Sequence, residues 1–383
     1  MPVEHPVNQS KILIISDAWL PQVNGVVRTL QATMHELQAM GHEVLIIGPD
    51  ASRWCTVAAP SYPSIKLEFL ARVRVARIIR DFQPDFVHIA TEGPLGWAVR
   101  NLCLWQGRPF TTSYHTRFPE YVAARVPRLL AKPVRILTYA LLRRFHAPSS
   151  AIMVATPSIQ NELQRRKFRR LVRWVRGVDT KTFRPYGKFL PSYAGLPRPL
   201  LLYVGRVAVE KNLRAFLEIP THGSKIVVGD GPDLAILQRE HPMAHFLGAM
   251  EGEQLGRHYA AADVFVFPST TDTFGLVLLE ACACGLRIAS VPAPGPSDIF
   301  ADPATRDFAV LDDNLERAIG FALQKPDVSE NPREFAETFS WQACTQQFYQ
   351  HLQAPTPKAL KRMARLRGWL GRWWQRALAL AVK

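Results

Sequence analysis

The sequence has little cysteine and no long hydrophobic run, and each shortage excludes a class of protein. Its 383 residues include only five cysteines, and this odd, scattered set fits reduced thiols better than a disulfide framework. No uninterrupted apolar segment approaches the roughly 18 residues that a membrane-spanning helix needs. The opening residues MPVEHPVNQS lack the apolar core of a secretory signal peptide. We therefore expect a cytoplasmic protein that is soluble or lies on the inner face of the cytoplasmic membrane.

Acidic residues are also scarce relative to basic ones. The chain has 47 Lys and Arg against 32 Asp and Glu, which gives a formal net charge of +15. This excess indicates an anionic partner: a nucleic acid, a phosphate-rich ligand or an acidic membrane surface. The sequence shows no nucleic-acid-binding module with stacking aromatic residues, so we expect no nucleic-acid partner.

Short apolar segments alternate with helix-length segments through most of the chain. The expected strands are KILIIS, HEVLIIG, DFVHIA, PFTTSYH and AIMVATP, followed after a gap by LLLYVGR, KIVVGDG, HFLGA, DVFVFP and RIASV. This alternation predicts parallel sheets that are covered by helices on both faces. The gap at 183–199 is rich in proline and glycine and has no periodicity, so we interpret it as a linker.

The predicted fold is therefore α/β, with two Rossmann-like parallel-sheet domains that face a cleft. Ligands of such domains bind at the carboxyl ends of the strands. The expected divisions are a first domain at 1–185, a linker at 186–198, a second domain at 199–339, a further helix at 340–353, and a basic amphipathic helix at 354–383.

Two strand-end loops carry residues suited to phosphate. Asn24 and Gly25 precede a helix whose N-terminus favours an anion, although a turn without a ligand explains them equally well. Gly205 permits a tight turn before Arg206 and Lys211, and a guanidinium and an ammonium are suited to a diphosphate. The alternative is that both cations are solvated surface charges.

The segment TTDTFGLVLLEACACGL at 270–286 joins a polar loop to an apolar helix that contains one carboxylate, Glu280. Gly275 leaves free backbone N–H groups at the helix start, which suit a phosphate. A carboxylate in an apolar helix needs partners, and adjacent ribose hydroxyls supply two hydrogen bonds. Asp272 in the loop is placed to contact a second sugar. In the alternative, Glu280 faces solvent, and the buried stripe consists of Leu276, Leu279, Ala283 and Leu286.

His115, in the segment TTSYHTRFPEY, follows a strand of the first domain and is expected to lie opposite the second domain. A lone histidine is more often structural than catalytic, but the strand-end position favours a role in the site. Gly229 and Gly231 in VVGDGPD border a nucleotide base or form a simple turn. His241 and His245 have the spacing of a metal pair, but a proline interrupts the helix between them and no third ligand is near. We expect no metal.

The ordered set of motifs resembles the retaining nucleotide-sugar glycosyltransferases of family four, which have the GT-B architecture. The matching segments are LPQVNGVVRTL, YHTRFPEY, RGVDTKTFRP, YVGRVAVEKN, VVGDGP and DTFGLVLLEACACG, and the resemblance extends to about residue 352. The helix at 340–353 resembles the family's final helix, which implies that it crosses back to the first domain. The first two look most like the branch that contains lipid glycosyltransferases and GDP-mannose-dependent mannosyltransferases. The resemblance implies transfer of a hexose from a UDP- or GDP-hexose with retention of configuration and without a cofactor.

The resemblance also implies which residues bind the donor. Arg206 and Lys211 match the pair that holds the donor diphosphate. Gly25 lies in the loop near the phosphates. Glu280 matches the glutamate that binds the donor ribose, in agreement with the chemistry of a carboxylate that needs two hydroxyl partners.

The catalytic residues that the resemblance implies are His115 and Asp272. His115 matches the histidine beside the reacting sugar. Asp272 matches the first acid of an acid-x7-glutamate motif, which contacts the transferred sugar together with the backbone of Thr273, Phe274 and Gly275. The family usually has glutamate at this position, and aspartate is one methylene shorter, so the identity of the hexose is left open.

Two segments that are both basic and apolar bear on the acceptor. From residue 358 onward the chain has eight basic residues and no acidic one, and on a helix most of its apolar residues fall on one side. Such helices lie in the plane of an anionic membrane; a helix docked on the protein's own surface is the alternative. The segment 124–145 is similar in composition, or else it is an ordinary core helix with charged edges.

We therefore expect the tail at 355–383 to bind an anionic membrane surface. The expected acceptor is a membrane lipid such as diacylglycerol or a glycolipid. A soluble or polysaccharide acceptor, with the tail serving as a protein-docking helix, is the alternative.

Overall fold

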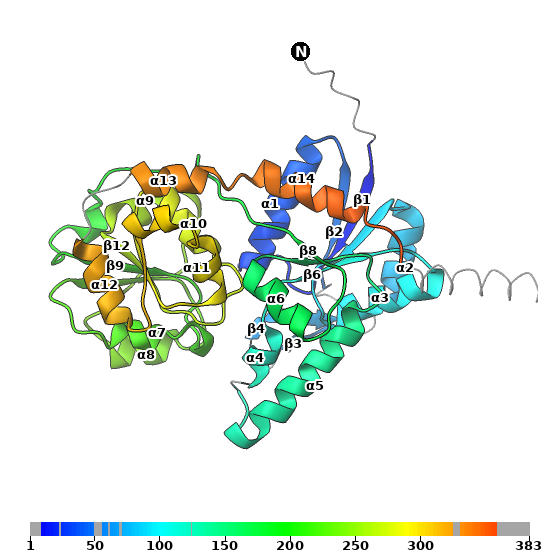
Figure 1. Cartoon of the computed structure of the whole chain (residues 1–383), viewed down its shortest axis with the longest axis horizontal. Helices are drawn as coiled ribbons and strands as arrows, with labels where there is room; N and C mark the ends of the chain where they lie inside the picture. Colours follow the sequence, from blue (N-terminus) through cyan, green and yellow to red (C-terminus); the bar gives the residue numbers. More distant parts are fainter. Residues whose placement is uncertain are drawn as a thin grey trace, which may run out of the picture.

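A computed structural model of the chain describes residues 9–22, 24–49, 56–59, 62–68, 71–123, 125–324 and 330–357. The tail expected to bind a membrane lies outside the described residues from 358 onward. Within the described residues, two six-stranded parallel sheets form separate lobes (Figure 1). The predicted α/β fold with two parallel-sheet domains is confirmed.

The first domain has the strand order β2-β1-β5-β6-β7-β8. Its strands are β1 (Lys11–Ile15), β2 (Glu43–Ile47), β5 (Phe86–Ile89), β6 (Thr111–Tyr114), β7 (Ile152–Val154) and β8 (Leu171–Arg173). Its helices are α1 (Gly25–Ala39), α2 (Arg72–Phe82), α3 (Pro94–Gln106), α4 (Phe118–Ala123), α5 (Arg128–His146) and α6 (Pro157–Arg165). An antiparallel pair, β3 (Thr56–Ala59) and β4 (Tyr62–Glu68), stands apart from this sheet.

The second domain has the strand order β11-β10-β9-β12-β13-β14. Its strands are β9 (Leu200–Val204), β10 (Ser224–Val228), β11 (His245–Phe246), β12 (Val264–Phe267), β13 (Arg287–Ser290) and β14 (Ala309–Leu311). Its helices are α7 (Leu213–Leu217), α8 (Leu234–Glu240), α9 (Gly252–Ala261), α10 (Leu276–Ala283), α11 (Pro294–Ile299), α12 (Leu315–Gln324) and α13 (Glu330–Glu337). Short 3₁₀ turns are η1 (Pro191–Tyr193), η2 (Val209–Lys211) and η3 (Pro303–Asp307).

Both faces of each sheet are buried, which explains why most of the strands are rich in apolar residues. In β1, Leu13 and Ile15 belong to one core cluster, while Ile12 and Ile14 belong to the cluster on the opposite face. Successive side chains of a strand point to opposite faces, so a strand covered on both sides favours apolar residues at consecutive positions. The same division holds in β9, where Leu202 and Leu201 lie in different clusters.

The last described helix, α14 (Trp341–Leu352), follows α13 of the second domain but packs on the first. Figure 1 shows it beside α1. Its Cys344, Phe348 and Leu352 join Leu30 and Leu37 of α1 in one buried cluster. The helix therefore crosses back between the domains, as the resemblance implied.

The chain passes between the domains a first time just before the linker, and this passage lies against the return. Val178 N donates to Phe339 O over 2.9 Å. An added Cβ at Gly177 would lie 2.5 Å from the backbone nitrogen of Trp341. Val178 and Phe183 pack in the core of the second sheet. Two adjacent segments thus join the two lobes.

We predict opposite stability effects for alanine at two helical glycines. An added Cβ at Gly96, at the start of α3, would lie 2.1 Å from the backbone oxygen of Thr91, whereas nothing lies within 4 Å of one added at Gly320 in α12. Gly96→Ala should lower the free energy of unfolding by about 1–3 kcal/mol through this overlap. Gly320→Ala should raise it by about 1 kcal/mol, because alanine favours a helix interior. Thermal and denaturant unfolding measure both, and a stable Gly96→Ala variant would contradict the packing described.

Candidate functional site

The two domains meet where the carboxyl ends of their strands and the starts of their helices come together. Each contact joins a side chain on one domain to a group on the other. The polar contacts are Arg28 with Glu280, Thr273 with the His115 carbonyl, Arg125 with Glu210, and Ser158 with Asp298. The start of α1 also lies beside the start of α10, since an added Cβ at Gly25 would lie 3.8 Å from Leu276 Cδ1.

Glu280 is buried in α10 and has a partner on each carboxylate oxygen. It is 5% exposed. Arg28 Nη1 donates to Oε1 over 3.0 Å, and Tyr259 Oη donates to Oε2 over 3.0 Å. Burial raises the pKa of Glu280, while Arg28 and then Tyr259 lower it. The solvent-facing alternative for Glu280 is wrong, because α10 is buried on all sides from residue 278 to 283.

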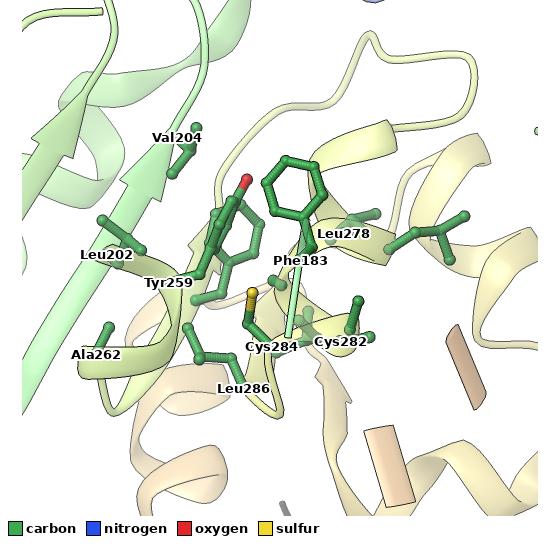
Figure 2. Close-up of a cluster of buried hydrophobic side chains, with 14 of the residues drawn as sticks. Phe183, Leu202, Val204, Tyr259, Ala262, Leu278, Cys282, Cys284 and Leu286 are labelled. Carbon is green, nitrogen blue, oxygen red and sulfur yellow. The ribbon is translucent and has the colours of Figure 1, made fainter. Parts of the chain in front are cut away.

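The hydroxyl of Tyr259 is held in place because its ring is part of the second domain's core. Figure 2 shows Tyr259 beside Phe183, among side chains from α10 and β9. The two rings meet edge to face at 5.9 Å and 81°. The ring centroid of Phe265, in β12, lies 5.6 Å from that of Tyr259. A ring packed in this way cannot swing its hydroxyl away from Glu280 without opening the core.

Asp272 and Lys211 form an ion pair in the second domain. Lys211 Nζ donates to Asp272 Oδ1 over 2.5 Å. The second oxygen, Oδ2, is buried and has no hydrogen-bond partner among the described residues. A buried carboxylate oxygen without a partner is costly, so this atom is available to a ligand hydroxyl. The sequence placed both residues in the site but did not predict that they pair.

The backbone between Asp272 and α10 is shaped for close approach. Gly275 has a φ of +96° and precedes the first helical residue, and no side chain caps this helix. The Thr273 hydroxyl donates to the His115 carbonyl over 2.7 Å. An added Cβ at Gly295 would lie 2.2 Å from the Phe274 oxygen, so α11 also holds this loop. The uncapped start of α10 retains the partial positive charge that suits a phosphate.

The glycines after β9 and β10 are required by the protein itself. An added Cβ at Gly229, where φ is +149°, would lie 1.9 Å from the Gly205 oxygen, and one at Gly231 would lie 2.2 Å from the Val207 oxygen. The two strand-end loops therefore pack backbone against backbone. This favours the simple-turn explanation of Gly229 and Gly231, and contact with a nucleotide base stays a prediction. Arg206 follows in the β9 loop, where its carbonyl accepts the Tyr203 hydroxyl at 2.8 Å.

Asn24 has a structural role that the sequence reasoning missed. Its Oδ1 accepts from Val26 N and Val27 N at 3.0 Å each, so it caps α1. The first N–H groups of α1 are thereby occupied, unlike those at the start of α10. The position of Gly25 beside Leu276 keeps it at the domain boundary, and its contact with donor phosphates stays a prediction.

His115 lies at the end of β6 with its ring partly buried. Arg176 Nη2 is 3.3 Å from His115 Nδ1. A guanidinium only donates, so Nδ1 accepts and the proton of the neutral ring sits on Nε2. Burial lowers the pKa of His115 well below its usual value, and Arg176 and His88 lower it further. Nε2 is buried without a partner among the described residues, so the ring offers one neutral N–H donor.

Arg176, which contacts His115, lies in the motif RGVDTKTFRP. The sequence alone suggested no role for it. Its guanidinium lies 4.1 Å from the Trp174 ring and donates to the Trp174 and Val175 carbonyls at 2.6 and 3.0 Å. Burial lowers its pKa to about 10, so it stays charged at neutral pH.

Asp17 is a further buried acid that sequence reasoning missed. Its carboxylate accepts from Leu95 N at 2.9 Å, from Gly96 N at 3.2 Å and from the Thr91 hydroxyl at 2.9 Å. Burial raises its pKa to about 6, against the lowering effect of these hydrogen bonds. It ties the loop after β1 to the start of α3. The sequence signal that could have identified Asp17 is its position as an acidic residue shortly after the buried strand β1.

Two parallel-sheet domains whose strand ends meet around paired cations and acids define the GT-B class of glycosyltransferase. Residues 23–182 match the model of Glycosyltransferase Family 4, and residues 198–324 match that of Glycosyl transferases group 1. The chain belongs to the family-four glycosyltransferases and is an enzyme of the hexosyltransferase class. Among the described residues, no helix is both long and apolar enough to span a membrane.

The chain is similar to several characterised glycosyltransferases. A GDP-mannose-dependent alpha-mannosyltransferase of Mycobacterium tuberculosis is 29% identical over 315 residues, which cover 77% of this chain and 82% of the relative. An alpha-monoglucosyldiacylglycerol synthase of Streptococcus pneumoniae is 26% identical over 359 residues, covering 84% and 80%. The structure of sucrose-phosphate synthase from Thermosynechococcus elongatus superposes with a TM-score of 0.71 at 21% identity, covering 89% of this chain and 98% of that one. At this level of identity, the structural similarity supports the same fold and nothing about the activity.

We predict that Lys211→Ala and Glu280→Ala each lower kcat/KM for hexosyl transfer by at least about 100-fold. The first removes the ammonium group that we expect to bind the donor diphosphate, and the second removes the carboxylate that we expect to bind the ribose hydroxyls. Loss of a charged group that binds the transition state costs on this scale. Steady-state kinetics measure the loss, and circular dichroism checks that both variants stay folded. Lys181→Ala, at an exposed lysine outside the site, is the matched control and should keep normal activity. Near-normal turnover in either site variant would show that the site lies elsewhere.

Proposed function

We propose that the enzyme transfers a hexose, with retention of configuration, from a UDP- or GDP-hexose to a membrane lipid such as diacylglycerol or a glycolipid. The observation that carries the lipid acceptor is the solvent-facing apolar and basic surface of α5 in the first domain. The name of one similar protein, an alpha-monoglucosyldiacylglycerol synthase, supports a lipid acceptor, and the name of another, a GDP-mannose-dependent alpha-mannosyltransferase, supports a nucleotide-sugar donor.

The charges at the domain boundary suit a donor of this kind. Lys211, Arg206 and the uncapped start of α10 supply positive charge for a diphosphate. Glu280 is placed to accept the ribose hydroxyls, and the unpartnered Oδ2 of Asp272 is placed to accept from the transferred sugar. The protein thus has cations of its own for the leaving group, and we propose that transfer needs no metal.

The reaction must stabilise a departing diphosphate and an oxocarbenium-like sugar. The bond between C1 and the phosphate oxygen breaks while the acceptor hydroxyl oxygen bonds C1 from the same face. The acceptor proton passes to the leaving phosphate oxygen, so no protein base is needed. His115, neutral and with a free Nε2–H, donates a hydrogen bond at the site and carries no positive charge that would repel the oxocarbenium centre.

Helix α5 projects from the first domain (Figure 1). Tyr139, Leu142, Phe145 and His146 are its buried residues. Several of its other apolar residues are solvent-exposed, with Leu129 at 93% and Leu137 at 71%. The exposed basic residues on the same helix are Arg128, Lys132, Arg135, Arg143 and Arg144.

Apolar side chains beside cations on a projecting helix suit an anionic membrane surface. The ordinary core-helix explanation of the segment 124–145 accounts for one face of α5 only. A lipid acceptor would reach the domain boundary from this surface, and the tail from residue 358 would add a second basic attachment. We propose that the enzyme is peripheral on the inner face of the cytoplasmic membrane.

A test of the whole proposal incubates the enzyme with UDP-glucose, UDP-galactose, UDP-glucuronate or GDP-mannose, and with diacylglycerol vesicles, a glycolipid or a soluble sugar. We expect one donor to release its nucleoside diphosphate only with a lipid acceptor, at a rate that a chelator does not change. Mass spectrometry of the product identifies the sugar and the acceptor. Transfer to the soluble acceptor alone would favour the alternative, and loss of activity with the chelator would contradict metal-free transfer.

We predict that the double variant Leu129→Ser/Leu137→Ser binds anionic phospholipid vesicles at least tenfold more weakly than the unaltered protein. Two fully removed leucine contacts with lipid are worth several kcal/mol, of which even 1.4 kcal/mol is tenfold. Vesicle co-flotation measures binding, and a parallel chain ending at residue 357 separates the contribution of the tail. Met243→Ser is the control, because Met243 is 88% exposed but lies on the second domain. Equal flotation of the double variant would exclude α5 as the membrane surface.

A further inference from the structure

The carboxylate of Glu280 is held by one group from each domain. Tyr259 of α9 donates to Oε2, and Arg28 of α1 donates to Oε1 across the domain boundary, both at 3.0 Å. The Glu280 side chain is 7% exposed and that of Arg28 is 28% exposed. Burial of an ion pair requires good geometry and further hydrogen bonds, and Tyr259 supplies one.

These two contacts leave lone pairs of the Glu280 carboxylate unused, and a ligand could donate hydrogen bonds to them. An ionised carboxyl group offers about four lone-pair sites, two on each oxygen. The contacts from Arg28 and Tyr259 use one site on each. Two adjacent hydroxyls of a ribose can therefore bind Glu280 without displacing either residue, provided that the carboxyl group is ionised.

The ionisation of Glu280 depends on its surroundings. Several charged and titratable groups lie on α10 and on the elements packed against it: Arg28 of α1; Glu253, Arg257, His258 and Tyr259 of α9; Cys282 of α10 and Cys284 just after it; Arg287 of β13; and Glu330, Arg333, Glu334 and Glu337 of α13. Among the described residues, only Arg28 and Tyr259 donate hydrogen bonds to the Glu280 carboxylate. Burial raises the pKa of Glu280 and Arg28 is the strongest influence that lowers it. Without Arg28 the pKa of Glu280 would rise further, so a larger fraction of the carboxyl would be protonated, with one oxygen as a donor.

We propose that Arg28 and Tyr259 are positioning residues of the donor site, which act through Glu280 by keeping its carboxylate ionised and oriented toward a ribose diol. This inference rests on the proposed function. Because Arg28 belongs to the first domain, ribose binding in the second domain then depends on both domains. The first domain is thereby part of the nucleotide site as well as the acceptor site.

The test measures binding of UDP and of GDP, and of their 2′-deoxy analogues, by calorimetry between pH 6 and pH 8. The unaltered protein should bind one of the two nucleotides, and more tightly than its 2′-deoxy analogue. Arg28→Gln should weaken that binding once the raised Glu280 pKa reaches the pH of the measurement, and by about tenfold for each unit by which the pKa then exceeds that pH. The loss should be larger at pH 6 than at pH 8, because the raised pKa leaves more of the carboxyl protonated at the lower pH. The preference for the 2′-hydroxyl should shrink in parallel.

Three further variants separate positioning from a general structural effect. Arg28→Lys keeps the cation and should retain most of the affinity. Tyr259→Phe should weaken binding by about fivefold, the size expected for one hydrogen bond. Ser158→Ala removes a side-chain contact with Asp298 at the same boundary and should leave both the pH dependence and the 2′-hydroxyl preference unchanged. Thermal melting confirms that each variant is folded.

The outcomes distinguish failure of the inference from failure of the proposed function. If the unaltered protein binds neither UDP nor GDP, the proposed donor is wrong. If it binds one of them but Arg28→Gln keeps the same affinity at every pH, the inference is wrong and the donor stands. A loss that is equal at pH 6 and pH 8 would also overturn the inference, because it would place Arg28 on the ligand directly.

Discussion

A carboxylate buried at a domain boundary must be paired, and much of this structure follows from how Glu280 is paired. An isolated buried charge costs several kcal/mol, and loss of one partner from a buried pair is strongly destabilising. One partner, Tyr259, is fixed by the core of the second domain. The other, Arg28, comes from the first turn of α1 in the first domain. The ion pair therefore links the packing of one domain to the position of the other.

The fold was largely predictable because buried parallel strands have a strong signature. Both faces of each sheet are covered, so strands such as β1 and β9 contain at least four consecutive apolar residues. The strands that were missed are short edge strands or lie outside the sheets. β8 and β14 have three residues each, too few for a periodic signal, and β3 and β4 form a separate antiparallel pair. These strands form because a neighbouring strand supplies backbone hydrogen-bond partners, and not because of a pattern in their own sequence.

The residues of the candidate site could be singled out from the sequence, but the side chains that contact them in the structure could not. Glu280 could be singled out because a carboxylate in an apolar helix needs a compensating group. Its partner Arg28 lies 252 positions away, and no local pattern specifies a contact at that separation. Arg176 was likewise visible in a motif, but its contact with His115 arises only when β6 and the segment after β8 lie together. For the glycines, the sequence suggested a ligand contact where packing is a sufficient explanation. Gly229 is required because the backbone of Gly205 lies too close to allow a Cβ there.

The charges at the site also locate the basic excess of the chain. Arg28, Lys211 and Arg125 are each paired with an acid at the domain boundary, so a large share of the site's positive charge is already balanced. The net charge of +15 must therefore reside mainly outside the paired site. Five basic residues and no acid lie on α5, and eight more without an acid follow residue 357. The excess that first suggested an anionic partner is thus concentrated in α5 and in the sequence after residue 357, the two segments that we propose as the membrane contact, rather than beside the proposed donor diphosphate.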